Sequence, residues 1–387
     1  MTKKIFALLI ALFVFTNIAN AQWQQTNWPY AGVVPLMAFE GNNLLATTYS
    51  DGVYLSTNNG NSWAAINTGL TNTFIVSLAV IDSIIFVGTA SGIFSSCDTG
   101  NNWTLVNASL PNTVTSFAKT DSNLIVGTWG GGICLSTNNG TTWNNISTGI
   151  TGLNYINTIL IKDTNIFACT AGSGIYLSSD IGLTWNNVSV GLTNSNVTSI
   201  AIVDTIVFVG TSNGVFQSID NGANWTPNLD LPITLVNSLT VHGANIYVGT
   251  DCCGVYLSSN NGTNWTAVNA GLTNLEIHPI VVCDSFVYAG TWGSGVWSRS
   301  LSNLLSIDDI NGNNSIAVYP NPSINSLTIE AQKQSTIEII NINGQIVKTV
   351  VCFNKSTSVD LTDLSRGVYI VRVKTDKKIV TKKIIKE

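Results

Sequence analysis

The sequence contains little charge and almost no arginine. Charged residues make up 10% of the 387 residues, and three of them are arginines. Between residues 22 and 300 the basic residues are Lys119, Lys162 and Arg299, against 13 acidic ones, which gives a net charge of −10. A surface this acidic repels nucleic acid and anionic lipid, so we expect neither as a partner.

Long apolar runs and helical periodicity are missing beyond the N-terminus. There, Lys3 and Lys4 precede an apolar run from Ile5 to Phe15, and Ala19-Asn20-Ala21 follows it. These are the three parts of a secretory signal peptide, so we expect residues 1–21 to be removed and the mature chain to begin at Gln22. No later segment approaches the roughly 18 apolar residues of a transmembrane helix, so we expect no membrane span.

The seven cysteines do not form a regular framework. Their number is odd, their spacings are irregular, and a chain of this size can fold without disulfides, so we expect most to be buried thiols. Cys252 and Cys253 are adjacent, which leaves a vicinal disulfide and two free thiols as alternatives. His242 and His278 have no repeated acidic partner, so we expect no metal and no cofactor.

A period of about forty residues runs through the chain from residue 22 to 300. Two markers share it: a tryptophan at 63, 103, 143, 185, 225 and 265, and a glycine at 52, 92, 132, 174, 214, 254 and 295. Each unit contains four short strands, which in the second unit are 75–80, 84–89, 92–96 and 103–107. Four strands per forty residues is the spacing of a β-propeller blade.

The two ends of the repeat array indicate how the ring closes. The last unit supplies three strands, ending at residues 295–300, and Trp23 lies forty residues before Trp63. The N-terminal strand therefore supplies the missing fourth strand. The predicted fold class is all-β: a seven-bladed β-propeller with N-terminal strand closure, which removes exposed sheet edges.

A hairpin pattern, S-x-[DN]-x-G-x-x-W, occurs six times. Its acidic or amide position is occupied by Asn58, Asp98, Asn138, Asp180, Asp220 and Asn260. Here residues 22–300 resemble the Asp-box (BNR) repeat family, and they are also similar to the photosystem II assembly-factor propellers. Asparagine in three of the six copies fits a structural turn role and does not fit carboxylate catalysis.

Sialidases share this hairpin, but their chemistry is not supported here. Enzymes of that family bind the sialic acid carboxylate with three arginines, and this segment contains Arg299 alone. A second repeated series lies between the first and second strands of the blades, at Asp82, Asp121, Asp163, Asp204 and Asp284. We expect these to be turn formers and not a calcium or catalytic ring.

Positions that depart from the repeat are the candidates for ligand binding. The loops between second and third strands carry Tyr49, Trp129 and Trp292 where other blades have Ala, Ser or Asp, and Trp28 lies in the loop that enters blade 1. The carboxylates Asp51, Asp251 and Glu276, with His278, come from the same sector of blades 6, 7 and 1. Aromatic rings beside carboxylates bind sugars, so we expect a glycan- or peptide-binding face. The alternative is that these residues plug the funnel or the closing seam.

The composition changes after Ser300. Residues 301–314 are expected to be a linker, and residues 301–387 contain 11 basic residues against 8 acidic ones. Short alternating strands predict a small Ig-like β-sandwich over residues 315–387. Its motifs are Tyr319-Pro320-Asn321-Pro322, Ile342-Asn343-Gly344-Gln345, Leu364 to Tyr369 and the basic tail Lys382 to Lys386. They resemble the type A C-terminal sorting domain of the Bacteroidetes type IX secretion system.

This resemblance implies export across the outer membrane, with the secretion machinery as a partner of residues 315–387. We expect a secreted or cell-surface binding or scaffold protein with no catalytic residues. One alternative is a propeller-type glycoside hydrolase using Asp51, Asp251 or Glu276. Another is a scaffold like the assembly factors, which would bind a protein.

Overall fold

A computed structural model describes residues 22–386 with the exception of 31, 108–109, 111, 121–122, 153–154, 302–316, 331–334, 342–344, 353–355 and 375–378. The chain divides into two compact units, residues 1–304 and 305–387, which are described separately. The expected signal peptide lies outside the described residues. So do Asp121, the Asn343-Gly344 turn and all of the expected linker except Leu301.

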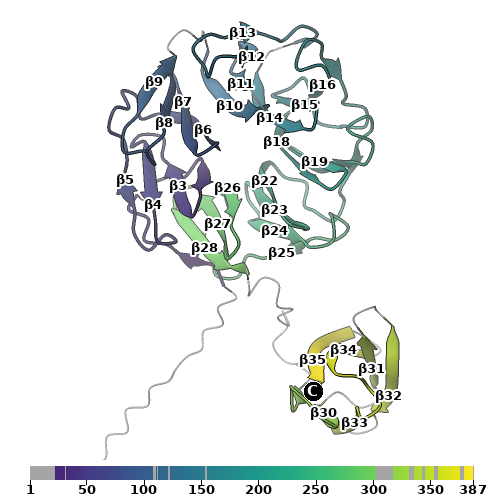
Figure 1. Ribbon diagram of the computed structural model, residues 1–387. Helices are drawn as coiled ribbons and strands as arrows, with labels where there is room; N and C mark the ends of the chain where they lie inside the picture. The colour runs from purple at the N-terminus through teal and green to yellow at the C-terminus, as the bar shows by residue number, and fades with distance from the viewer. Residues whose placement is uncertain are drawn as a thin grey trace, which may run out of the picture. The chain divides into compact units, whose positions relative to one another are not determined.

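The first unit consists of seven four-stranded antiparallel sheets arranged in a ring (Figure 1). We number these blades in chain order and give their strands from the inside outward. They are blade 1, β2 (Met37–Glu40), β3 (Asn43–Thr47), β4 (Val53–Ser56), β5 (Ala64–Ala65); blade 2, β6 (Ile75–Ile81), β7 (Ile84–Thr89), β8 (Gly92–Ser96), β9 (Thr104–Asn107); blade 3, β10 (Val114–Lys119), β11 (Leu124–Thr128), β12 (Gly132–Ser136), β13 (Asn144–Asn145); blade 4, β14 (Ile156–Lys162), β15 (Asn165–Thr170), β16 (Ile175–Ser178), β17 (Asn186–Asn187); blade 5, β18 (Val197–Val203), β19 (Ile206–Thr211), β20 (Gly214–Ser218), β21 (Thr226–Pro227); blade 6, β22 (Val236–His242), β23 (Asn245–Thr250), β24 (Val255–Ser258), β25 (Thr266–Ala267); and blade 7, β26 (Ile277–Val282), β27 (Phe286–Thr291), β28 (Val296–Ser300) and β1 (Gln24–Gln25).

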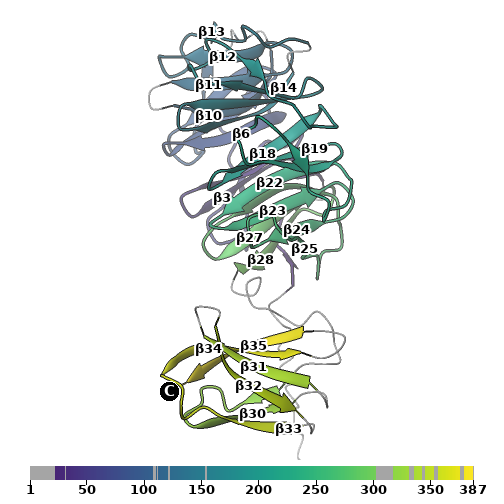
Figure 2. The same ribbon diagram turned by 90° about the vertical axis from the view of Figure 1, so that its right-hand side faces the viewer.

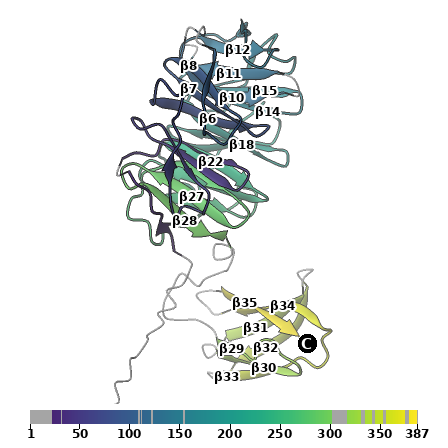
Figure 3. The ribbon, with the colours of Figure 1, turned by 60° about the vertical axis from the view of Figure 1, so that its left-hand side comes forward.

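The ring is closed by the N-terminal strand, as predicted. β1 pairs with β28, with Gln24 opposite Ser298 and Gln25 opposite Trp297. The innermost strands of neighbouring blades contact one another around the ring, and β2 contacts both β6 and β26. Figure 2 and Figure 3 show the ring from its side, with the sheets fanned around it. The seven sheets therefore form a closed circle.

Trp23 anchors the closing strand in the core between blades. Its side chain is 2% exposed. Its Nε1 donates to the Val268 carbonyl (2.6 Å) and its backbone N–H donates to the Ala270 carbonyl (2.8 Å), both in the segment that leaves blade 6. Leu301 is buried in the same cluster, so the propeller core extends one residue beyond the boundary expected at 300.

A belt of hydrogen bonds links the inner strands of blades 2 to 7. Each inner strand from β6 to β26 has an irregular register near its start. Such bulges re-aim one side chain. In blades 3 to 6 the re-aimed residue donates to the first carbonyl of the next inner strand, and in blade 2 the adjacent serine does so. The bonds run from Ser77 to Val114 (2.7 Å), Thr115 to Ile156 (2.5 Å), Asn157 to Val197 (2.8 Å), Thr198 to Val236 (2.5 Å) and Asn237 to Ile277 (2.9 Å).

The six repeated hairpins share one set of hydrogen bonds. In blade 2, the Asp98 carboxylate accepts from Ser96 Oγ (2.7 Å) and from the backbone N–H of Asn102 (3.0 Å), while Ser96 Oγ accepts from the Gly100 N–H (2.9 Å). Gly100 has φ of 82°, and a Cβ there would lie 2.2 Å from Ile66, so only glycine fits. Asn58, Asn138 and Asn260 accept the corresponding bonds through their amide oxygens.

The second unit has two antiparallel sheets with a shared apolar core. The smaller sheet has the order β29 (Ala317–Tyr319), β30 (Ser326–Glu330), β33 (Ser356–Asp360), and the larger has the order β32 (Ile346–Cys352), β31 (Ser335–Asn341), β34 (Gly367–Lys374), β35 (Ile379–Lys386) (Figure 3). The architecture is therefore sandwich-like. The basic tail is part of the edge strand β35, which pairs with β34 along its length.

Asn321 holds this last strand in place. Its side-chain Nδ2 donates to the Lys383 carbonyl (3.0 Å), and its Oδ1 accepts from the Ile385 N–H (2.8 Å). The Ser323 N–H adds a bond to the Ile385 carbonyl (2.8 Å). The Tyr-Pro-Asn-Pro motif and the basic tail, 62 residues apart at Asn321 and Lys383, therefore meet in one contact.

We predict that Trp23→Ala destabilises the ring. Removing a buried tryptophan costs about 3–5 kcal/mol, which lowers the melting temperature by roughly 10 °C. Calorimetry of the variant checks this, with Trp129→Ala as the control because that ring is 61% exposed. A melting temperature of Trp23→Ala equal to that of the control would show that the ring does not depend on this joint.

A second prediction concerns acid stability. Hydrogen bonds from Asn102, Thr184 and Asn224, followed by the serine hydroxyls and backbone N–H groups of each hairpin, lower the pKa of Asp98, Asp180 and Asp220 to about 2. Because the folded pKa is depressed, these aspartates stabilise the fold above pH 4 and this contribution is lost as the pH falls towards 2.

The triple variant Asp98→Asn/Asp180→Asn/Asp220→Asn should melt within about 2 °C of the parent at pH 7, because three native hairpins already use asparagine. Between pH 4 and 2 it should lose less stability than the parent. The reciprocal change Asn58→Asp should steepen the acid loss. Superimposable stability–pH curves for all three proteins would contradict the assignment.

Candidate functional site

In blades 3 to 7, two positions lie side by side at one rim of the ring. The first, the loop position, follows the threonine at the end of the second strand. In blade 1 the equivalent threonine is Thr48, one residue past β3, so the loop position there is Tyr49. The second, the entry position, precedes the inner strand. Within blade 7 the N–H of Trp292 donates to the Glu276 carbonyl (3.1 Å), and within blade 6 the N–H of Asp251 donates to the Leu235 carbonyl (3.0 Å). The loop position of one blade also faces the entry position of the next.

This neighbour relation brings aromatic rings together across the closing seam. Tyr49 of blade 1 stacks on Phe74 of blade 2, with ring centroids 5.5 Å apart and an angle of 20° between the planes. Tyr49 also meets Trp292 of blade 7 edge-on at 6.3 Å, and Trp292 covers the His278 ring at 4.9 Å. Phe74, Tyr49 and Trp292 are 48%, 38% and 45% exposed. The rings form a continuous row open to solvent.

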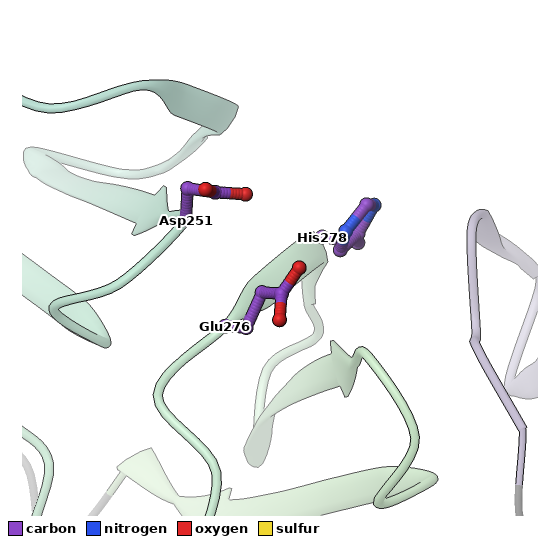
Figure 4. Close-up of side chains that lie close together, drawn as sticks. All are labelled: Asp251, Glu276 and His278. Atoms are coloured by element: carbon purple, nitrogen blue, oxygen red, sulfur yellow. The ribbon is translucent and has the colours of Figure 1, made fainter.

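The row ends in a cluster of titratable groups. One ligand-type atom from each of Asp251, Glu276 and His278 lies within 4.8 Å of the others. Figure 4 shows Asp251 projecting from the loop of blade 6 towards the two residues of blade 7. We call Phe74, Tyr49, Trp292, His278, Glu276 and Asp251 together the rim arc.

Burial and like charge shift the protonation of this cluster. Burial, and then the Asp251 charge, raise the pKa of the Glu276 carboxyl. Burial lowers the pKa of His278, although the Asp251 carboxylate opposes that effect. The imidazole is thereby held neutral near pH 7, with two carboxyl groups beside it.

Three other residues expected at the binding face make their contacts outside the rim arc. Trp28 packs against Trp63 (4.8 Å) and Tyr54 (5.2 Å), and belongs to the apolar cluster at the seam. Asp51 accepts a hydrogen bond from Ser50 Oγ (2.9 Å) within its own loop. Trp129, in blade 3, is exposed but pairs with Tyr155 of blade 4 (6.2 Å). The structure therefore brings together Tyr49, Asp251, Glu276 and Trp292 with His278, and leaves these three outside the arc.

Phe74 is not among the site residues predicted from the sequence. It occupies the entry position of blade 2, where blades 3 to 7 have Thr113, Tyr155, Asn196, Leu235 and Glu276. An alignment of that column would have singled out Phe74 and Tyr155 as its aromatic residues, but not the contact between Phe74 and Tyr49. The vicinal cysteines are free thiols, with Cys252 exposed and Cys253 half-buried.

A separate cavity opens on the opposite side of the ring. It has a volume of about 690 Å³ and is lined by turns of blades 1, 6 and 7, including Asn42, His242 and Asp284. His242 Nε2 lies 3.9 Å from the Asp284 carboxylate. The lining of this cavity is mainly polar, and it includes no residue of the rim arc.

Comparison with known protein families concerns the second unit. Residues 317–387 match the family described as the secretion system C-terminal sorting domain. These residues form a secretion sorting domain. The domain indicates export to the cell surface or the medium and implies contact with the type IX secretion machinery. In the part of the chain that the structure describes, no helix is long and apolar enough to cross a membrane.

A search of curated proteins finds no match, whereas solved structures give many. PorZ, a surface component of the type IX secretion system of Porphyromonas gingivalis, matches over 92% of this chain and 59% of its own, with 17% identity and a TM-score of 0.58. The chain thus spans less than two thirds of PorZ. At this identity the likeness concerns the fold.

Two further structures share the propeller architecture. YCF48, solved bound to a D1 peptide, matches over 74% of this chain and 97% of its own, with 11% identity and a TM-score of 0.58. The GH74 xyloglucanase of Xanthomonas campestris matches over 94% of this chain and 67% of its own, with 12% identity and a TM-score of 0.59. One of these proteins binds a peptide and the other is named as an enzyme, so the fold alone does not assign a function.

We predict that Asn321→Ala impairs export. The substitution removes both side-chain bonds from Asn321 to β35, so the sorting domain should fold incompletely and the chain should accumulate inside the cell. Surface proteolysis with cell fractionation measures the exported fraction, which we expect to fall several-fold, and to fall to background when residues 317–387 are deleted. Ile324→Ala is the control, because that side chain is 63% exposed. Normal export of Asn321→Ala would refute the role of this contact.

Proposed function

We propose that the chain is a non-catalytic carbohydrate-binding protein of the cell surface, exported through its sorting domain, and that the rim arc binds the glycan. The observation that carries this proposal is the row of Phe74, Tyr49 and Trp292, three large rings exposed side by side across the seam. Soluble proteins rarely leave such a row uncovered without a binding role.

The chemistry of the arc suits sugar rings. The aromatic faces offer apolar surface for the C–H faces of pyranose rings, and the carboxylates of Asp251 and Glu276 accept hydrogen bonds from hydroxyl groups. The net charge of −10 and the scarcity of basic residues between 22 and 300 favour a neutral glycan over an anionic one.

The arc is also held in place before any ligand binds. The Asn274 side chain donates to the Trp292 carbonyl (2.7 Å), and the Thr291 hydroxyl donates to the Gly295 carbonyl (2.9 Å), which fix the loop of blade 7. The Thr73 hydroxyl donates to the Ser50 carbonyl (2.7 Å) and ties the loop of blade 1 to blade 2. Preorganised loops reduce the entropy cost of binding.

A protein ligand is the second candidate, favoured by the likeness to YCF48 bound to a D1 peptide. Hydrolysis, favoured by the likeness to the xyloglucanase, is less well supported. Ligand-type atoms of Asp251 and Glu276 lie within 4.8 Å of each other, which is too close for the about 6.5–9.5 Å between the carboxyl groups of an inverting glycosidase, so only the retaining spacing of about 5–5.5 Å is open to this pair.

We also propose the domain plan that goes with this function. Residues 1–21 are a signal peptide, 22–300 an Asp-box propeller, 301–314 a linker and 315–387 an Ig-like sorting domain. The hydrogen-bond pattern of the repeated hairpins supports the Asp-box assignment. The Tyr369 hydroxyl, which donates to the Ser365 carbonyl (2.9 Å), supports the Ig-like one because such tyrosine corners occur in that fold.

We predict that Tyr49→Ala and Trp292→Ala each weaken glycan binding about tenfold. A lost stacking contact costs roughly 1.4 kcal/mol of binding free energy, which corresponds to this factor. Affinity electrophoresis against neutral plant and microbial polysaccharides measures this. Trp129→Ala is the matched control, because it removes an exposed tryptophan from the same loop position of another blade. Equal retardation of all three variants would overturn the assignment of the arc.

The same experiment separates the alternatives. Release of reducing ends that is abolished by Glu276→Gln would show a hydrolase. Absence of glycan binding together with a co-purifying protein lost in Trp292→Ala would show a protein-binding arc.

A further inference from the structure

His278 interrupts the belt of hydrogen bonds between inner strands. It occupies the register irregularity of β26, the place at which Thr115, Asn157, Thr198 and Asn237 donate to the next blade. Its Nε2 is buried and has no hydrogen-bond partner among the described residues. A buried polar atom without a partner costs free energy, so its retention calls for a ligand that the protein itself does not supply.

The groups around His278 carry uncompensated negative charge. Asp251 and Glu276 converge on it from two blades (Figure 4). The basic residues of the propeller bond elsewhere: Lys119 to Asp82, Lys162 to the Asp204 carbonyl (2.7 Å) and Arg299 to the Val268 carbonyl (2.9 Å). The Asp251 carboxylate accepts from the neutral amide of Asn237, at 3.5 Å.

From this geometry we infer that Asp251, Glu276 and His278 form a binding site for a divalent transition-metal ion such as Zn²⁺ or Mn²⁺. An ion there would supply the missing partner of the imidazole and neutralise both carboxylates. It would also bind blade 6 to blade 7 at the end of the rim arc.

The donor set selects the class of metal. One imidazole nitrogen with two carboxylate oxygens suits Zn²⁺ or Mn²⁺, whereas Ca²⁺ and Mg²⁺ prefer oxygen ligands alone. Zinc bonds of 2.0–2.2 Å place ligand atoms roughly 3.4 Å apart, so separations of up to 4.8 Å close by small rotations of the two flexible carboxylate side chains. Trp292, packed on the His278 ring at 4.9 Å, fixes the orientation of that ligand.

Calorimetric titration of the purified full chain with ZnCl₂ and MnCl₂ tests the site. We expect one equivalent to bind and the melting temperature to rise with metal concentration. His278→Asn and Asp251→Asn should each weaken binding at least tenfold. Asp251→Asn keeps an acceptor for Asn237, so its unliganded melting temperature should stay near that of the parent and serve as the check on folding.

Two controls exclude other sites. His242→Asn removes the histidine beside Asp284 on the opposite side of the ring and should leave binding unchanged. Cys252→Ser/Cys253→Ser removes the nearby thiols and should also leave it unchanged. The inference is overturned if no equivalent binds, if His278→Asn binds as tightly as the parent, or if only the cysteine variant loses binding. The titration contains no glycan, so an absence of metal binding would not contradict the proposed glycan binding. Likewise, an absence of glycan binding would not contradict the metal site.

Discussion

The joint between the two ends of the propeller is the constraint on which the rest of the structure depends. Seven wedges must meet, and the last wedge is completed by residues 24 and 25 pairing with β28. Trp23 fills the core beneath that pair and bonds to blade 6 through both its ring and its backbone. Without it, β28 would be left as an open edge and the apolar interior of blade 7 would meet water.

The candidate site residues cluster where the repeat is least regular. From blade 2 to blade 7, side chains of the inner strands are used to hold one blade to the next. Beside the seam, the corresponding side chain is a histidine with an unpartnered nitrogen, and the loops carry large rings where other blades have alanine or serine. Such departures from the residues that recur in the other blades are common at functional sites, because side chains that bind a ligand replace side chains that stabilise the fold.

Much of the fold could be predicted from the sequence because a repeat aligns positions in space as well as along the chain. The forty-residue period predicted the number of blades. Trp23, which lies one period before Trp63, predicted the closing strand. Tyr49, Asp251 and Trp292 share one alignment column, so their common rim followed. Contacts between columns did not follow: the loop position of one blade faces the entry position of the next, which is why Phe74 was missed and why Asp251 and Glu276, 25 residues apart in sequence, meet.

The sorting domain has a consequence for the timing of its own folding. One edge strand of its larger sheet, β35, ends at Lys386. Asn321 can bond to the Lys383 carbonyl and the Ile385 N–H only after this strand has been synthesised. A polypeptide that lacks residues 383–385 lacks the segment that Asn321 holds. The early motif and the last strand therefore become ordered together, because neither can complete its contacts while the other is missing.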